Sequence, residues 1–160
     1  MNVFDYAMEM EADGRKFYLE IAAKSKNQGI KTIAKMLAND EQKHFNILKK
    51  LKEEQPVLEK TEILKNAKNV FAEMKDKIDE FIKPESEIEL YKKAQEIEKK
   101  SENFYLEKAE GLKENYQKEI FKKIAEEEKK HYFLLENIIQ FVSRPLTWLD
   151  DAEFYHLDEY

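Results

Sequence analysis

Apolar residues recur every three or four positions along four long stretches of the chain, as they do on the buried face of an α-helix. These stretches predict helices over about residues 2–26, 30–54, 86–111 and 116–142. Gly29 is expected to end the first helix as a left-handed cap, and Pro56 and Pro145 to follow the second and the fourth. Ser86 and Glu89 form a capping box that is expected to open the third. The pattern therefore predicts an all-α four-helix bundle.

The segment between the second and third helices, residues 55–84, is too long for a tight turn and has an amphipathic pattern of its own. We expect this crossover to contain one or two shorter helices. Residues 143–160 form a tail that holds the only tryptophan, Trp148, and other aromatic residues. Because this apolar surface needs a partner, we expect the tail to dock on the bundle of residues 1–142 or on a partner subunit.

The two halves of the chain are similar to each other, with about residues 3–54 matching residues 85–142. Tyr18 aligns with Tyr105, and His44 aligns with His131, in each case 87 positions further on. Two copies of one helical hairpin would form a bundle with a pseudo-two-fold axis along its core. Polar residues at the repeated positions would meet there in pairs.

Each apolar stripe is interrupted by acidic residues or histidines at positions that should face the core. These residues are Glu11, Glu41, His44, Glu98, Glu128 and His131. A Glu and a His three positions apart lie about one turn apart on the same side of a helix, so both can reach one metal ion. A single Glu-x-x-His motif more often belongs to a solvated face. Here two such motifs lie in apolar stripes at the repeat offset, which predicts a site for two metal ions.

Carboxylates in a dry core repel one another, and each carries a desolvation penalty of about several kcal/mol. Two divalent cations would neutralise the four carboxylates of this group. Carboxylate and imidazole ligands favour iron or manganese over metals that prefer thiolates. We therefore expect two Fe ions or two Mn ions, and the spacing of the ligands does not choose between these metals. The third histidine, His156, has no partner motif and is expected to be structural or exposed.

Composition excludes several classes of function. The 160 residues contain no Cys, which excludes a disulfide framework, a thiolate zinc site and an iron centre held by cysteine. A net charge of −6 argues against a nucleic-acid partner, and no stretch approaches the length of a membrane span. The first residues lack the basic and apolar regions of a signal peptide. We therefore expect a cytoplasmic protein that does not associate with membranes.

The ordered motifs resemble those of the ferritin-like di-iron proteins, and among these the rubrerythrin-like branch. The resemblance covers about residues 3–142 and rests on four pairs: Glu11 and Tyr18, Glu41 and His44, Glu98 and Tyr105, and Glu128 and His131. It implies that Glu41 and Glu128 bridge the two metals and that the other four ligands are terminal. It also implies that the hydroxyls of Tyr18 and Tyr105 lie beside the ligands, although both residues are equally consistent with ordinary core aromatics.

Two acidic residues, Asp40 and Glu127, directly precede the two Glu-x-x-His motifs. They are candidates to orient the histidines across the bundle, and a position on the surface is equally consistent with the sequence. The chain departs from a typical rubrerythrin at Ser101, where an additional Glu is usual; Glu102 is offset from that position by about 100°. It also lacks the four-cysteine rubredoxin-like domain. Electrons are therefore expected from an external donor, such as a rubredoxin-like protein or a flavoprotein.

The leading hypothesis is a di-iron oxidoreductase of the peroxidase type, which reduces hydrogen peroxide and protects the cell from oxidants. A homodimer is the expected assembly. The alternative is a ferroxidase that oxidises iron with dioxygen and handles or stores it, and storage would require a cage-forming shell. A third hypothesis is a non-catalytic helical adaptor that acts through its tail and binds no metal.

Overall fold

The computed structural model describes residues 2–51, 56, 58–75, 87–150 and 157. This part of the chain contains no strand and is built from helices: α1 (Val3–Lys24), α2 (Gln28–Lys50), α3 (Ile63–Lys75), α4 (Ile88–Ala109), α5 (Asn115–Ser143) and α6 (Pro145–Asp150). The predicted all-α class is confirmed.

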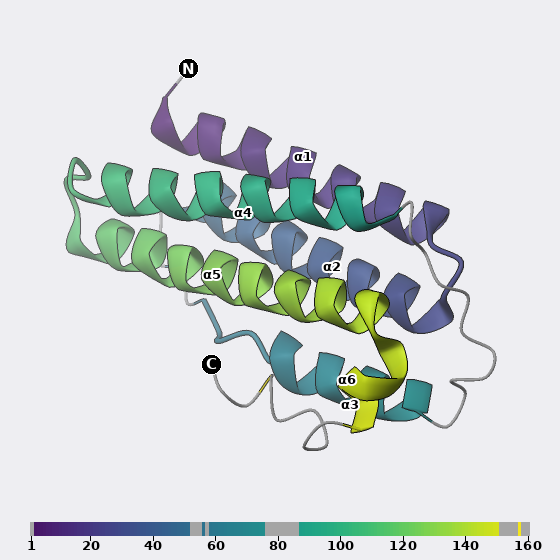
Figure 1. Cartoon of the computed structure of the whole chain (residues 1–160). Coiled ribbons are helices and arrows are strands. Elements are labelled where there is room, and N and C mark those ends of the chain that lie inside the picture. The colour runs from purple at the N-terminus through teal and green to yellow at the C-terminus, as the bar shows by residue number, and fades with distance from the viewer. Residues whose placement is uncertain (1, 52–55, 57, 76–86, 151–156, 158–160) are drawn as a thin grey trace.

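The four long helices form two hairpins that lie side by side (Figure 1). α1 packs against α2 in the first hairpin, and α4 packs against α5 in the second. Contacts of α1 with α4 and of α2 with α5 join the hairpins into one bundle. α3 lies along the outside of α2 and α5, and α6 packs against α3 and α5.

The junction between α1 and α2 differs from the prediction. α1 ends at Lys24, and the backbone is extended at Ser25 and Asn27 before α2 begins. The prediction that Gly29 caps the first helix is wrong, because Gly29 is the second residue of α2. A Cβ atom at Gly29 would overlap the side chain of Met74 in α3. The glycine therefore permits the close approach of α3 and does not make the turn.

The ends of two other helices fall partly outside the described residues. α2 ends at Lys50, whereas the predicted end at residue 54 lies beyond the described part of the chain. α4 begins at Ile88 after Glu87, whose side chain caps no backbone N–H of the helix but accepts a hydrogen bond from the hydroxyl of Tyr91 at 2.8 Å. Ser86 of the predicted capping box is also outside the described residues. Within the crossover, α3 is a helix of the expected kind.

Buried apolar residues of the described part form two clusters, one at each end of the bundle. The first includes Ile21, Leu37 and Leu135, and the second includes Leu48 and Phe121. Burial of these side chains is the main force that holds the helices together. The buried carboxylates and histidines of the four long helices lie between the two clusters along each helix.

The described residues of the tail pack on the bundle of their own chain. The ring of Trp148 lies 4.7 Å from that of Phe71 in α3 and 5.8 Å from that of Phe141 in α5. Leu149 and Leu157 are buried in the same cluster. These contacts hold α3 and α6 against the bundle. None of the described helices combines the length and the apolar character that crossing a membrane requires.

Candidate metal centre

Every long helix of the bundle contributes to one buried polar cluster. Its members are Glu11 of α1, Glu41 and His44 of α2, Glu98 of α4, and Glu128 and His131 of α5. None of these residues is more than 3% exposed. The structure thus brings together all six residues predicted from the sequence. Their binding of metal stays a prediction.

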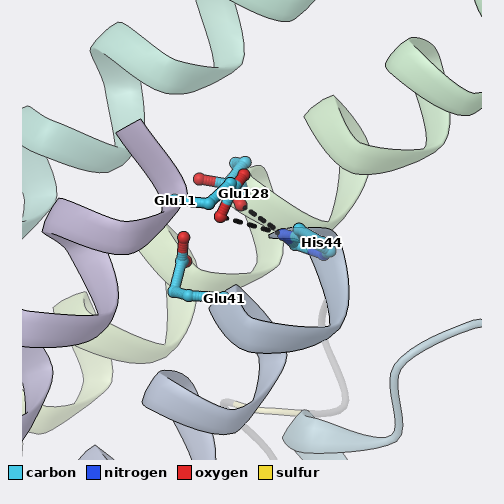
Figure 2. Close-up of side chains that lie close together, drawn as sticks. All are labelled: Glu11, Glu41, His44 and Glu128. Atoms are coloured by element: carbon cyan, nitrogen blue, oxygen red, sulfur yellow. Dashed lines mark ion pairs between the residues drawn. The ribbon is translucent and has the colours of Figure 1, made fainter. Parts of the chain in front are cut away.

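The six residues form two overlapping groups with the spacing of a metal site. Glu11 and His44 belong to one group, and Glu98 and His131 to the other, while Glu41 and Glu128 are members of both. Within each group, one oxygen or nitrogen atom per residue lies within 4.8 Å of the others. The two shared carboxylates therefore have the positions that bridging ligands would need. Figure 2 shows the first group, in which the carboxylates of Glu11 and Glu128 point toward the His44 ring.

The His44 ring uses its two nitrogens for different partners. Nδ1 lies 3.4 Å from Oε2 of Glu11 and 3.0 Å from Oε1 of Glu128. On the other side of the ring, Nε2 is hydrogen-bonded to Oε1 of Glu127 at 2.8 Å. Nδ1 therefore faces the cluster while Glu127 orients the ring, an arrangement typical of histidine ligands to metals.

His131 repeats this arrangement in the second group. Nδ1 lies 3.2 Å from Oε1 of Glu41 and 3.3 Å from Oε1 of Glu98. Nε2 is hydrogen-bonded to Oδ2 of Asp40 at 2.9 Å. The rings of His44 and His131 are nearly parallel, with centroids 6.1 Å apart. Asp40 and Glu127 are both buried, so each lies behind a histidine of the opposite hairpin rather than on the surface.

The two tyrosines of the repeat also contact the cluster across the bundle. The hydroxyl of Tyr105 donates a hydrogen bond to Oε1 of Glu11 at 2.7 Å, and that of Tyr18 donates one to Oε1 of Glu98. Burial and the neighbouring carboxylates raise the pKa of both tyrosines well above 10.0. Both phenols therefore keep their protons and act as hydrogen-bond donors.

Thr61, which the sequence analysis did not single out, donates hydrogen bonds to Asp40 and Glu127, the two carboxylates behind the histidines. Its hydroxyl donates to Oδ2 of Asp40 at 2.6 Å, and its backbone N–H donates to Oε2 of Glu127 at 3.0 Å. Thr61 lies in the irregular segment before α3, where no helical periodicity marks a residue as inward-facing. The one feature of the sequence that could have drawn attention to Thr61 is its hydroxyl, placed just before a predicted amphipathic helix.

Crowding of the acidic groups changes their affinities for protons. Burial, together with the negative charges of neighbours such as Glu11, raises the pKa of Glu41 well above 4.5, and burial and neighbouring carboxylates also raise that of Glu128. Burial acts in the same direction on Glu11, but the positive charge of His44 and hydrogen bonds outweigh it and lower the pKa. Burial opposes charge on His44 and His131, yet the adjacent carboxylates raise the pKa of each well above 6.5. In the metal-free chain these shifts favour the protonated, positively charged forms of both histidines.

Four buried atoms of the cluster have no hydrogen-bond partner among the described residues: Glu11 Oε2, His44 Nδ1, Glu98 Oε2 and Glu128 Oε1. Buried polar atoms in proteins are normally paired, so such a concentration needs an explanation. The carboxylate oxygens can offer lone pairs to a cation, and His44 Nδ1 can do so once it has lost its proton, so the two overlapping groups can hold two cations. The residues present therefore fit a two-metal centre.

A protein-family model, Rubrerythrin, matches residues 2–139 of the chain. The chain belongs to the rubrerythrin family. No curated protein and no solved structure matches it. Membership in the rubrerythrin family and the helical structure together confirm the ferritin-like bundle predicted from the sequence. The buried Glu and His cluster is compatible with the di-iron site of this family.

The position that distinguishes this chain from a typical rubrerythrin is buried. Ser101 lies one turn beyond Glu98 in α4. The neighbouring Glu102 belongs to neither of the two groups, and its Oε1 lies 3.0 Å from Nζ of Lys99. The structure therefore does not bring Glu102 into the cluster. His156 lies outside the described residues.

Proposed function

We propose that this rubrerythrin-family protein is a di-iron oxidoreductase that reduces hydrogen peroxide with electrons from an external donor. The observation that supports it most is the pair of carboxylates, Glu41 and Glu128, shared by two buried groups that each contain one histidine. Two redox-active metal ions supply two electrons to the O–O bond, and with two protons one peroxide becomes two waters.

Each metal ion would have its own terminal ligands. His44 and Glu11 would hold one, and His131 and Glu98 the other, with Glu41 and Glu128 common to both. The hydrogen bonds that the two tyrosines donate to Glu11 and Glu98, and those that the histidine rings donate to Glu127 and Asp40, fix the ligands before metal binds. Such preorganisation lowers the cost of assembling the site.

The surrounding chain keeps bulk water away from the reacting groups. The two apolar clusters cover the ends of the site, and both histidine rings are fully buried. A dry site strengthens the electrostatic interactions within it and limits side reactions of a reactive oxidant. The 160 residues contain no Cys that could hold a rubredoxin-like iron, which is consistent with an external electron donor. We propose a rubredoxin-like protein or a flavoprotein as this donor, and iron as the metal.

Rapid mixing tests this function. Protein loaded anaerobically with Fe²⁺ is mixed with peroxide and, separately, with dioxygen, and the near-ultraviolet absorbance of the oxidised iron is followed. The proposal expects much faster oxidation by peroxide, saturating at two irons per chain. Faster oxidation by dioxygen that continues beyond two irons per chain would instead indicate iron handling or storage. Failure to bind metal at all would favour an adaptor.

The mass of the protein in solution provides an independent test. We propose a homodimer, as expected for the peroxidase, whereas storage of iron requires a large closed shell of subunits. A dimer would therefore support the proposed activity, and a shell would support the ferroxidase alternative.

A further inference from the structure

Thr61 joins carboxylates that belong to different hairpins. Its hydroxyl donates to Asp40 of α2 at 2.6 Å, and its backbone N–H donates to Glu127 of α5 at 3.0 Å. Both carboxylates are only 5% exposed. Hydrogen bonds to buried charged groups are among the stronger ones in proteins, so these two contacts restrict where each carboxylate can lie.

Each of these carboxylates holds a different histidine of the candidate metal centre. Asp40 Oδ2 is bonded to Nε2 of His131 at 2.9 Å, and Glu127 Oε1 is bonded to Nε2 of His44 at 2.8 Å. Through one carboxylate on each side, Thr61 acts on both histidine rings at their Nε2 atoms. The hydroxyl of Thr61 acts on His131 through Asp40, and the backbone N–H of Thr61 acts on His44 through Glu127.

This link is not duplicated by the internal repeat. The ligands, the tyrosines and the acidic residues behind the histidines all occur as pairs 87 positions apart, but the position 87 residues after Thr61 is Trp148. The two halves of the site are therefore supported differently. Changing the Thr61 side chain removes the donor to Asp40 and leaves the backbone donor to Glu127 in place.

The segment around Thr61 lies at the surface of the bundle, next to the inner hydrogen bonds. Lys60 and Glu62 are exposed, whereas Thr61 is half-buried. These three residues line two surface pockets of about 600 and 640 Å³. Asp40 also lines the first of these pockets, so the bond from Thr61 to Asp40 lies at the edge of the bundle.

We infer that Thr61 is a positioning residue of the metal centre, and that its hydroxyl sets the affinity of the metal position served by His131. The inference depends on the two-metal site but not on peroxide as the oxidant, because metal binding is its readout. Mutation of a residue that hydrogen-bonds a metal ligand typically weakens metal binding by about 10–100-fold. Asp40 has that place beside His131, and Thr61 is one hydrogen bond further from the metal. We therefore expect a loss of about three- to tenfold at one of the two metal positions.

A structural role of the same hydroxyl has to be separated from this one. Thr61 Oγ1 also accepts a hydrogen bond from the backbone N–H of Ile63 at 3.2 Å, at the start of α3. The only tryptophan, Trp148, packs on Phe71 of α3. Its fluorescence therefore reports whether α3 remains docked when Thr61 is changed.

The test compares Co²⁺ binding by the natural chain, Thr61→Val, Thr61→Ser and a control, Thr32→Val. Valine keeps the volume of threonine without its hydroxyl, and serine keeps the hydroxyl. Thr32 donates its hydroxyl to the backbone oxygen of Gln28 at 3.0 Å, and it precedes Asp40 in α2 by more than two helical turns. Metal-free protein is titrated with Co²⁺ while the visible absorbance and Trp148 emission are recorded. The exchangeable, paramagnetically shifted ring N–H signals in proton NMR identify the histidine affected, with His44→Gln used for assignment.

The expected result for Thr61→Val is one Co²⁺ bound about three- to tenfold more weakly, the other unchanged, and a shift of the His131 N–H signal alone. Thr61→Ser restores both positions, and Thr32→Val changes neither. Equal weakening of both positions would overturn the inference, because undocking of α3 would also remove the backbone donor to Glu127. An unchanged Co²⁺ curve, loss of helical structure, or a serine variant that fails to restore binding would overturn it as well.

Discussion

The hydroxyl of Tyr105 in α4 donates a 2.7 Å hydrogen bond to Oε1 of Glu11 in α1, so one hairpin orients a carboxylate of the other. In return, the hydroxyl of Tyr18 in α1 donates a hydrogen bond to Oε1 of Glu98 in α4. These two bonds cross the interface between α1 and α4, at which the hairpins meet. The bonds that shape the candidate metal centre therefore also hold the bundle together.

Replacing Tyr105 with phenylalanine is expected to destabilise the protein by about 1–3 kcal/mol, because a buried carboxylate oxygen loses its donor. Urea unfolding followed by circular dichroism measures the change. Tyr6→Phe is the matched control, since the Tyr6 side chain is 50% exposed. Equal stability of the two variants would show that the Tyr105 bond contributes nothing to folding.

The shared carboxylates provide the most direct test of metal binding. Glu41→Ala or Glu128→Ala is expected to lose both metal ions, because each carboxylate belongs to both groups. Metal analysis after anaerobic loading and desalting measures this loss. Glu20→Ala, on the exposed face of α1, is the control and is expected to keep full occupancy. A Glu41→Ala chain that still bound both metals would show that Glu41 is not a bridging ligand.

Gly14 gives Glu41 the room it occupies. A Cβ atom at Gly14 would lie 3.1 Å from Oε2 of Glu41, so Glu41 would have to shift by a few tenths of an ångström in Gly14→Ala. Alanine favours the helix by up to about 1 kcal/mol over glycine. We therefore expect Gly14→Ala to bind metal more weakly while the metal-free protein is no less stable.

Measurements of Co²⁺ affinity and of unfolding by urea separate these two effects. Gly111→Ala is the control, because the nearest atom to a Cβ there is the backbone oxygen of Lys108 at 3.8 Å, an ordinary contact. If Gly14→Ala bound Co²⁺ as tightly as Gly111→Ala, the space beside Glu41 would have no part in metal binding.

The helices and the meeting of the six polar residues could be predicted from the sequence. The side chains that face the core can be identified within each helix from the spacing of its apolar residues. The repeat offset then predicts that equivalent residues of the two hairpins lie opposite each other. Whether Asp40 and Glu127 face the interior could not be predicted in this way. Their positions depend on the rotation of each helix against the opposite hairpin, which the pattern of one helix does not contain.

The contacts of irregular segments could not be predicted for a different reason. Thr61 lies 21 residues from Asp40 and 66 from Glu127, and it meets them only because the chain crosses the bundle at this point. The prediction that Gly29 caps the first helix is wrong for a similar reason. Its smallness serves contact with Met74, a residue far along the chain, and not the local turn that glycine usually indicates.

The stability of the metal-free protein is expected to fall as the pH rises above 6.5. The pKa of His44 and of His131 is raised well above 6.5 in the folded chain, since neighbouring carboxylates outweigh the effect of burial. The folded state therefore binds more protons than the unfolded state in this range. Stability from these groups is complete below pH 6.5 and is lost as the pH rises through the folded pKa.

At lower pH, some carboxyl groups make the stability of the metal-free protein fall with rising pH and others make it rise. Burial and neighbouring charges raise the pKa of Glu41 and Glu128 above 4.5, so their contribution also declines as the pH rises. Burial opposes the lowering of the pKa of Asp40, but the hydrogen bond and positive charge of His131 dominate. Stability due to Asp40 is therefore present above pH 3.8 and is lost as the pH falls through its lower folded pKa.

Urea unfolding of chelator-treated protein between pH 6.5 and 8.5 measures the predicted slope. A His44→Gln/His131→Gln double variant is the control, and its stability is expected to depend less on pH because the two raised histidine pKa values are absent. Bound metal should reverse the trend in the natural chain, since a cation competes with the protons of the same groups and binds better as they leave. A metal-free chain whose stability rises across this range would contradict the predicted proton uptake on folding. In that case the histidines would be neutral in the folded protein, and metal binding would release fewer protons than the structure indicates.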